Sequence, residues 1–582
     1  MQHRVRAIWI LVCLACGFTV ISYNLIQIQL VQHDKYWRIA VENHLRPQKI
    51  QPDRGSIFDS DGNLLAATQV RTDLHLDGKL LEQPEEQLPQ LADILQMPVQ
   101  QLTDVFDPHK RDIRLADNLE DGVVAKLKAL RWNSLIFLPH DRRFYPNNEM
   151  AAHVLGFVDG EGHGIAGMEK EMERSLSGIP GERWVELDGK SKDIAGYQKS
   201  ETPAIDGYDV TLTIKMAIQH VVENELDQIV QTYQPNAAYI IVMDPHTGEI
   251  MAMASRPTYD PNDSKTFQPD AVRDRCLTDM VEPGSIFKII TMAGALNEGL
   301  VNLNTPVFCE NGSFYYGGKY LKDDEPHGWL STLEVMAQSS NIGFAHLGLN
   351  LGENRLYNYA TAFGIGQRTG LMTDQSESAG LLRPVSKWSA LSVTRIPMGQ
   401  EVAATPVQLV TAMSVIANGG RLLVPQLARQ VTDKEGRVIK VYEPHLVRQV
   451  ITPDAAHEVA RALEQVTIDG TAKNVQIQDA SGGRHAYAGK TGTAQKFVNG
   501  EYSHTQHVSS FIGFMPVEDP AFVALVMVDD PHTAVNKDYG AEVSAPVFAS
   551  IARQMVQIMN LPADLPGPLQ APVLSANNPA PL

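Results

Sequence analysis

Residues 485–495 read His-Ala-Tyr-Ala-Gly-Lys-Thr-Gly-Thr-Ala-Gln, a run typical of a β-strand. Strand-like runs also lie at both ends of the same region, at residues 238–243, 249–253, 508–514 and 522–528. Between the two groups, residues 285–417 have mainly helical patterns. Strands from both ends of a domain with helices between them favour one antiparallel β-sheet covered by helices, an α+β fold.

This domain is expected to span residues 207–560. The composition changes near residue 210, where residues 209–214 alternate like a strand and residues 215–233 have the spacing of an amphipathic helix. The next two strands are separated by the turn Asp244-Pro245-His246-Thr247-Gly248, which predicts a hairpin. Beyond the domain, residues 561–582 contain six prolines and little periodicity, which predicts a disordered tail.

A second module is expected at residues 40–205. Apolar residues flank the turn Ser60-Asp61-Gly62-Asn63, which is typical of a hairpin. A glycine-rich bend at residues 160–167 precedes a helical run. Because this module has no convincing pair of nucleophile and base, we expect a scaffold or docking module that does no chemistry.

An apolar stretch lies at residues 7–30. As a helix it would span roughly 36 Å, enough for the core of a bilayer. Three basic residues, His3, Arg4 and Arg6, precede it, which predicts a cytoplasmic N-terminus at residues 1–6 and places the rest of the chain outside. A cleaved secretory signal and lipidation at Cys16 are the alternatives to this membrane anchor.

Charge and cysteine content exclude some classes of function. The 582 residues include 49 basic and 68 acidic side chains, a formal charge of −19, which disfavours nucleic acid as a partner. The four cysteines form neither a disulfide framework nor a zinc motif.

The first candidate catalytic motif is Glu282-Pro283-Gly284-Ser285-Ile286-Phe287-Lys288-Ile289. Pro-Gly breaks the chain and leaves Ser285 at a helix start. Residues three apart share a helix face, so the Lys288 ammonium is expected to reach the Ser285 hydroxyl. Burial against apolar neighbours would lower the pKa of Lys288 and let it act as the base for this nucleophile.

Two further motifs follow in the same domain. Ser339-Ser340-Asn341 supplies a hydroxyl that can relay a proton and an amide that can hold both the lysine and the substrate. Lys490-Thr491-Gly492-Thr493 lies on the strand described first. Its cation and hydroxyls suit a carboxylate, and its glycine allows close approach of a ligand backbone.

In this order the motifs resemble those of class B penicillin-binding proteins, over about residues 1–560. The septal, cell-division (FtsI) type is the most similar. Three other segments share the resemblance: Arg54-Gly55-x-Ile57-x-Asp59, Arg143-x-Tyr145-Pro146 and Gly164-x-x-Gly167-x-Glu169. Two positions depart from it. Ser340 stands where related motifs have aspartate, and His507 falls near a position where relatives often place an aromatic at the rim of the acyl pocket.

The resemblance implies that residues 40–205 form an elongated, non-catalytic α+β pedestal of a dimerisation-like kind. It also implies a peptidoglycan D,D-transpeptidase that uses no metal or organic cofactor. Ser285 would attack the penultimate D-alanine of a stem peptide while Lys288 takes its proton, and Ser339 and Asn341 would complete the relay. The terminal carboxylate would be bound by Lys490, Thr491 and Thr493. Backbone amides of Ser285 and Thr493 would form the oxyanion hole, and Gly492 would admit the substrate.

The implied partners are D-Ala-D-Ala stem peptides, β-lactams as covalent inhibitors, a membrane-embedded glycan polymerase and other division proteins. The implied location is the cytoplasmic membrane, with a single pass, the catalytic domain on the outer side, and placement at the septum. Three alternatives remain: an elongation-type transpeptidase, a D,D-carboxypeptidase or β-lactamase-like hydrolase, and a non-catalytic division scaffold or β-lactam sensor.

Overall fold

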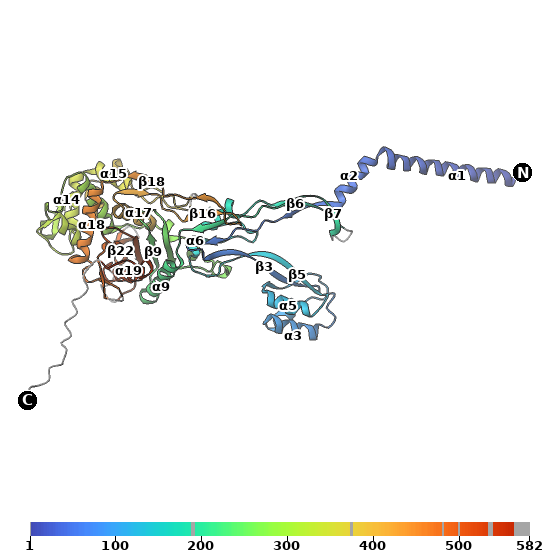
Figure 1. Ribbon diagram of the computed structural model, residues 1–582, viewed down its shortest axis with the longest axis horizontal. Coiled ribbons are helices and arrows are strands. Elements are labelled where there is room, and N and C mark those ends of the chain that lie inside the picture. Colours follow the sequence, from blue (N-terminus) through green and yellow to red (C-terminus); the bar gives the residue numbers. More distant parts are fainter. Residues whose placement is uncertain are drawn as a thin grey trace, which may run out of the picture. The chain divides into compact units, whose positions relative to one another are not determined.

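The computed structural model describes residues 2–187, 193–372, 376–479, 482–498, 501–533 and 539–563 (Figure 1). The chain forms two compact units, Met1–Gly55 with Ser177–Gly207, and Ser56–Leu176 with Tyr208–Leu582. Most of the expected disordered tail lies outside the described residues.

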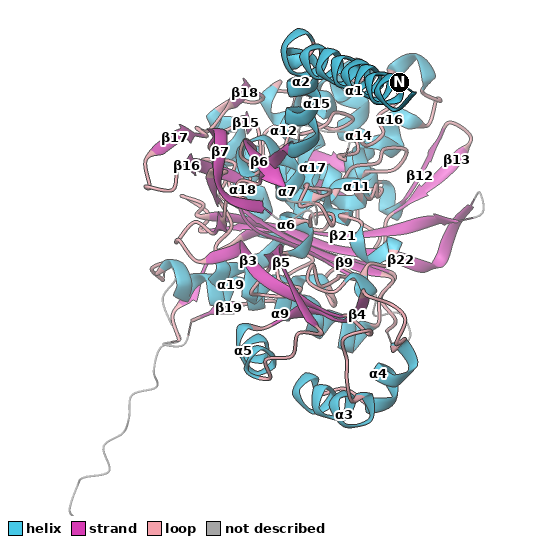
Figure 2. Cartoon of the chain, turned by 90° about the vertical axis from the view of Figure 1, so that its right-hand side faces the viewer, coloured by secondary structure: helices cyan, strands magenta, loops and turns pink. Residues whose placement is uncertain are grey.

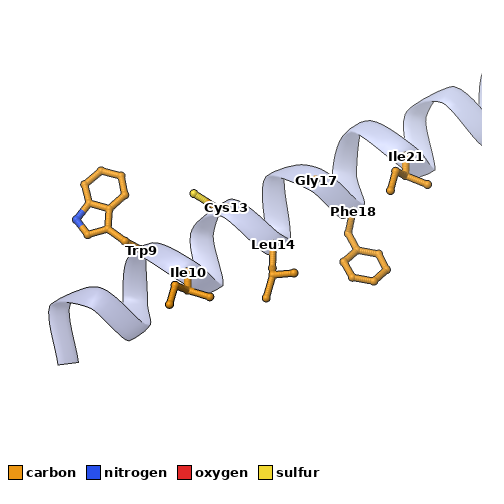
Figure 3. Close-up of a pocket in the computed structure, with 7 residues that line it drawn as sticks. All are labelled: Trp9, Ile10, Cys13, Leu14, Gly17, Phe18 and Ile21. Carbon is orange, nitrogen blue, oxygen red and sulfur yellow. The ribbon is translucent and has the colours of Figure 1, made fainter. Parts of the chain in front are cut away.

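The first unit begins with an apolar helix. Helix α1 (Gln2–Ile26) continues into the π-helical segment η1 (Gln27–Val31), and together they are long and apolar enough to cross a membrane. Figure 3 shows large apolar side chains such as Trp9 and Phe18 projecting from this helix, which is exposed throughout α1. The helix is consistent with a single-pass membrane anchor.

The rest of this unit is one helix and one antiparallel sheet. The sheet has the order β1-β6-β7. The elements are α2 (His33–His44), β1 (Leu45–Ile50), β6 (Gly181–Leu187) and β7 (Asp193–Thr202).

The second unit contains a seven-stranded sheet that joins distant parts of the sequence. Its order is β17-β16-β8-β2-β3-β4, and β5 also pairs with β3. The expected hairpin around Asp61-Gly62 is confirmed, because β2 pairs antiparallel with β3. Strand β8 pairs with both β2 and β16, so the segments expected in the pedestal and in the catalytic domain share one sheet. The strands are β2 (Ile57–Phe58), β3 (Leu64–Leu76), β4 (Ile113–Leu119), β5 (Leu135–Phe144), β8 (Asp209–Leu212), β16 (Ala428–Thr432) and β17 (Val438–Val441).

Six helices lie between β3 and β8 in the described part of the sequence. Leucines of α3 and α5 pack with those of β3 and β5 in a small hydrophobic core. The helices are α3 (Pro84–Leu95), α4 (Val99–Val105), α5 (Asp121–Ala129), α6 (Ala152–Leu155), α7 (Gly167–Glu171) and α8 (Glu173–Leu176).

The five-stranded sheet expected from residues 485–495 and their counterparts is confirmed. Every neighbouring pair in its order, β10-β9-β23-β22-β21, is antiparallel. All of β9 is buried because helices cover both faces, α9 and α19 on one side and α17 and α18 on the other (Figure 2). The strands are β9 (Ala237–Met243), β10 (Ile250–Arg256), β21 (Ala488–Val498), β22 (Glu501–Met515) and β23 (Phe522–Asp529). The four helices are α9 (Met216–Tyr233), α17 (Pro406–Ala417), α18 (Pro453–Ile468) and α19 (Ser544–Met559).

The strand expected at residues 485–495 begins later than predicted. Residues 484–485 form a short strand, β20 (Arg484–His485), which pairs with β19 (Ile477–Gln478). Strand β21 begins only at Ala488, because the chain changes sheets at Tyr487, whose buried side chain donates to Val475 O at 2.8 Å.

The helical region at residues 285–417 is also more mixed than expected. It contains two small antiparallel pairs, β11 with β14 and β12 with β13. These strands are β11 (Pro306–Phe308), β12 (Ser313–Tyr316), β13 (Lys319–Lys322) and β14 (Trp329–Ser331). They were not predicted, because three or four residues are too few to show alternation.

Short helices and one further strand pair complete the second unit. They are η2 (Ser264–Thr266), α10 (Pro269–Val272), α11 (Arg275–Thr278), η3 (Gly284–Phe287), α12 (Lys288–Asn297), η4 (Glu310–Gly312), α13 (Thr332–Ala337), α14 (Asn341–Leu351), α15 (Glu353–Ala362), η5 (Val385–Lys387), α16 (Ser392–Arg395), η6 (Ile396–Met398), β15 (Arg421–Leu423) and β18 (Leu446–Gln449).

Candidate active site

The candidate nucleophile lies on a tight turn. Gly284 opens η3 with a φ of 53°, and Ser285 follows it, half-buried, just before α12. The Gly284 N–H donates to Gly399 O at 3.3 Å. A Cβ at Gly399 would lie only 2.2 Å from Gly284 O, so the two backbones can meet only because residue 399 is glycine. This contact holds Ser285 at the helix start that the sequence predicts.

Lys288 is fully buried at the first position of α12. Its Nζ donates to Ser339 O at 2.6 Å, to Ser339 Oγ at 3.0 Å and to Asn341 Oδ1 at 2.8 Å. Burial lowers the pKa of Lys288 to about 8, while the carboxylates of Asp323 and Asp324 act in the opposite direction. Near neutral pH a fraction of such lysines is uncharged and able to accept a proton.

Ser339 connects the candidate catalytic groups. Its Oγ accepts from Lys288 Nζ at 3.0 Å and from Lys490 Nζ at 2.9 Å, and it donates to Ser285 Oγ at 3.3 Å. The direct contact expected between Lys288 and Ser285 is not made within the described part of the chain. The reason is that Lys288 Nζ is directed to the turn at residues 339–341, so Ser339 lies between the two groups.

Lys490 lies on β21, the last strand in the order of the five-stranded sheet, and is also fully buried. Its Nζ donates to Thr491 O at 3.1 Å as well as to Ser339 Oγ. Burial, and next the charge on Lys288, lower the pKa of Lys490 well below its usual value. The sequence suggested a cation here, suited to a carboxylate. A carboxylate bound beside it would favour the charged form again.

The remaining residues of the third motif lie on the same strand. Thr491 Oγ1 lies 2.7 Å from Thr471 Oγ1, and Thr493 Oγ1 accepts from Gly540 N at 3.1 Å. A Cβ at Gly492 would lie 2.3 Å from Ser510 Oγ and 3.1 Å from Ile286 Cγ1. Glycine at this position therefore lets the strand lie close to the nucleophile helix. Both threonine hydroxyls already have partners inside the protein.

Asn341 begins α14 and is fixed from two directions. Its Oδ1 accepts from Lys288 Nζ, and its Nδ2 donates to Lys322 O at 3.2 Å. The neighbouring Ser340 Oγ donates to Asp323 Oδ2 at 2.6 Å and accepts from Gly343 N at 2.9 Å, which caps α14. Asp323 was missed at the sequence level, because nothing in its local pattern indicates that it approaches this turn.

Glu282, directly before the Pro-Gly break, forms a second network that was missed. Its Oε1 accepts from Glu401 N at 3.0 Å and from Tyr502 OH at 3.1 Å. Burial raises the pKa of Glu282. These bonds tie strand β22 to the nucleophile turn. His507 lies on the same strand, opposite Gln495, and is half-buried.

The structure thus joins five of the eight predicted residues in one hydrogen-bond network centred on the Ser339 hydroxyl and places the other three beside Lys490 on β21. The gathered residues are Ser285, Lys288, Ser339, Asn341 and Lys490. This arrangement can move a proton from one serine to a partly neutral lysine, beside a second cation suited to an anionic ligand.

Family models match most of the chain. Residues 238–553 match the penicillin binding protein transpeptidase domain, and residues 49–212 match the penicillin-binding protein dimerisation domain.

Curated relatives match nearly the full length. Stage V sporulation protein D of Bacillus subtilis is 32% identical over 94% of this chain and 85% of the relative. The probable peptidoglycan D,D-transpeptidase PenA of Neisseria gonorrhoeae is 29% identical over 96% of this chain and 94% of the relative. The peptidoglycan D,D-transpeptidase FtsI of Escherichia coli is 28% identical over 95% of this chain and 91% of the relative.

Solved structures share the fold. A crystal structure of penicillin binding protein 3 from Mycobacterium tuberculosis complexed with aztreonam matches with a TM-score of 0.69 and 26% identity. The match covers 90% of this chain and all of that one. A peptidoglycan synthetase from Bifidobacterium adolescentis matches with a TM-score of 0.71 and 25% identity, over 90% of this chain and 98% of that one.

Proposed function

The chain belongs to the class B penicillin-binding proteins and is a peptidoglycan D,D-transpeptidase, and on this premise we propose that Ser285 is its nucleophile and that it works at the division septum. The observation that carries the assignment of the nucleophile is the position of Ser339 Oγ, which is hydrogen-bonded to Ser285, Lys288 and Lys490 at once.

In the proposed acylation, Ser285 Oγ bonds to the carbonyl carbon of the penultimate D-alanine. Its proton passes to Ser339 Oγ, and the proton of Ser339 passes to neutral Lys288. Backbone N–H groups of Ser285 and Thr493 stabilise the oxyanion. The C–N bond then breaks, and the terminal D-alanine leaves as an amine that takes the proton back from Lys288.

In the proposed transfer step, an amine from a neighbouring stem peptide attacks the ester carbonyl. Lys288 takes the amine proton and returns one to Ser285 as the ester C–O bond breaks, which leaves an amide cross-link. Before acylation, the terminal carboxylate of the donor peptide pairs with Lys490 beside the hydroxyls of Thr491 and Thr493, and Gly492 lets this strand lie close to the nucleophile helix. Asn341 orients the reacting amide.

Covalent labelling by a fluorescent penicillin tests the nucleophile. The Ser285→Ala variant is expected to lose labelling completely while the protein still folds, because only one hydroxyl is removed. Ser264→Ala, at an exposed serine in η2, is the matched control and should label like the wild type. Undiminished labelling of Ser285→Ala would show that another residue is acylated.

Two further observations support the rest of the proposal, which concerns the septal role, the membrane topology and the partners. His3, Arg4 and Arg6 precede the apolar helix, which favours a cytoplasmic N-terminus, a retained anchor and a catalytic domain on the outer side. The similarity to FtsI supports septal work, and a membrane-embedded glycan polymerase and other division proteins are the partners that the family resemblance implies. The relative named for sporulation makes a sporulation setting one competing proposal, and the elongation role that the sequence left open is the other.

Fluorescence microscopy of a tagged full-length chain tests the septal proposal. The label is expected in a band at midcell in dividing cells. Uniform labelling of the side wall would contradict the septal role and favour elongation, without affecting the assignment of Ser285.

A further inference from the structure

The turn that carries Ser339 and Asn341 adopts an unusual backbone. Ser339 has a φ of 55°, a left-handed conformation that residues other than glycine rarely adopt. The turn must nevertheless keep Ser339 Oγ between Ser285 and two lysines. Strained conformations of this kind persist only where the surroundings hold them.

The end of strand β13 holds this turn from outside. Lys322 O accepts from Asn341 Nδ2 at 3.2 Å. The two carboxylate oxygens of Asp323 accept from Ser340 Oγ at 2.6 Å and from Ile342 N at 2.9 Å. The three bonds therefore hold three consecutive residues, 340, 341 and 342. The two bonds that Asp323 accepts come from the residues directly before and after Asn341.

We propose that Asp323 is a positioning residue of the transpeptidase reaction, whose carboxylate fixes the turn at residues 339–342 so that Ser339 and Asn341 stay aligned with Lys288. This inference rests on the proposed function of Ser285 and Lys288. Related motifs carry an aspartate between the serine and the asparagine, whereas this chain has Ser340 there. Here the carboxylate comes instead from a segment 17 residues upstream.

Burial and charge support a role beyond folding. Ser340 and Ile342 are almost completely buried and Asp323 is half-buried, so their bonds are partly shielded from water, which makes them costly to lose. Asp323 also acts on the base, because its carboxylate favours the charged form of Lys288. The charged groups around Lys288 are Lys490 from β21 and the carboxylates of Asp323 and Asp324, and the ring of Phe344 from α14 lies 5.5 Å from its Nζ.

Asp324 provides a matched control for charge. It is exposed, and like Asp323 it favours the charged form of Lys288. Only Asp323 also makes hydrogen bonds to the turn. Replacing either aspartate with asparagine removes one negative charge near Lys288, but only the change at Asp323 disturbs the bonds.

The experiment measures the second-order rate constant of acylation by a fluorescent penicillin over a range of pH, using the full-length protein in detergent. For Asp323→Asn we expect a loss on the order of 10- to 100-fold per folded molecule, because misplacing Ser339 by a fraction of an ångström breaks the relay. For Asp324→Asn we expect a limiting rate near that of the wild type, with the rising part of the pH profile moved to lower pH, because Lys288 loses a stabilising charge.

A rescue variant separates positioning from general stability. Combining Asp323→Asn with Ser340→Asp should restore most of the lost rate, because the new amide can donate to the new carboxylate and aspartate also caps a helix well. If Asp323→Asn does not fold, Ser340→Ala removes the same bond from the other side and should show a similar loss.

The inference is overturned if the folded Asp323→Asn variant acylates like the wild type, if Asp324→Asn loses as much limiting rate as Asp323→Asn, or if the double variant stays as slow as the single one. A wild-type rate for Ser340→Ala, where that variant is the one measured, overturns it too. Failure of the proposed function gives a different result, namely a wild-type protein in which penicillin does not label Ser285.

Discussion

Lys288 and Lys490 donate to the same oxygen, Ser339 Oγ, although the proposed reaction asks different things of them. Lys288 must be neutral to accept a proton, whereas Lys490 must be charged to bind a carboxylate. Burial lowers the pKa of both lysines, and the charge of Lys288 lowers that of Lys490 further. A substrate carboxylate resolves this conflict, because it favours the charged form of its neighbour Lys490 and leaves Lys288 as the lysine that loses its proton.

Exchanging each lysine for arginine tests this division of roles. Arginine does not deprotonate near neutral pH, so Lys288→Arg is expected to slow acylation by about 1,000-fold or more even at saturating β-lactam. Lys490→Arg keeps a cation for the carboxylate, so its loss should be smaller and should appear partly in apparent affinity.

The pH dependence of the acylation rate constant tests the role of Lys288 as the base independently. With the pKa of Lys288 lowered to about 8, its neutral fraction increases as pH rises through that value, so the acylation rate constant of the wild type should rise there. Stopped-flow acylation over a range of β-lactam concentrations and pH measures both effects. Greater residual activity in Lys288→Arg than in Lys490→Arg would reverse the assignment of base and carboxylate anchor.

At the scale of elements, the candidate site is built where a helix start, a turn and an edge strand meet. Their positions could be predicted, because Pro-Gly before an apolar run, a polar string among helices and a glycine-containing strand are local patterns. The parts that could not be predicted depend on tertiary contacts. Examples are the left-handed conformation of Ser339, the approach of Asp323 from a four-residue strand, and the bond from Tyr502 to Glu282, 220 residues away.

The dependence on tertiary contacts also explains the error in the predicted start of a strand. Strand β21 was expected to begin at residue 485, but the chain leaves one sheet for another before Ala488, which alternation along the sequence cannot reveal. The domain boundary expected near residue 207 stays a prediction. The pairing of β8 with β2 joins segments on either side of it, and such a parallel contact between distant strands leaves no local signal in the sequence.

At the scale of the whole molecule, every candidate catalytic residue lies in the second unit, and the apolar helix belongs to the first. The hydrogen bonds that define the site join residues between Glu282 and Gly540. The helix should therefore determine where the enzyme resides without determining how fast it reacts.

A chain lacking residues 2–31 is accordingly expected to move from the membrane fraction to the soluble fraction and to acylate with a rate constant within about two-fold of the full-length enzyme in detergent, because its site keeps every hydrogen bond. Fractionation and penicillin-binding kinetics on the two proteins, with melting curves to confirm equal folding, provide the comparison. A shortened chain that melts like the full-length protein but acylates more than ten-fold slower would mean that the first unit takes part in forming the active site. Equal rates would show that the anchor acts on the transpeptidase only by holding it at the surface where its substrate is made.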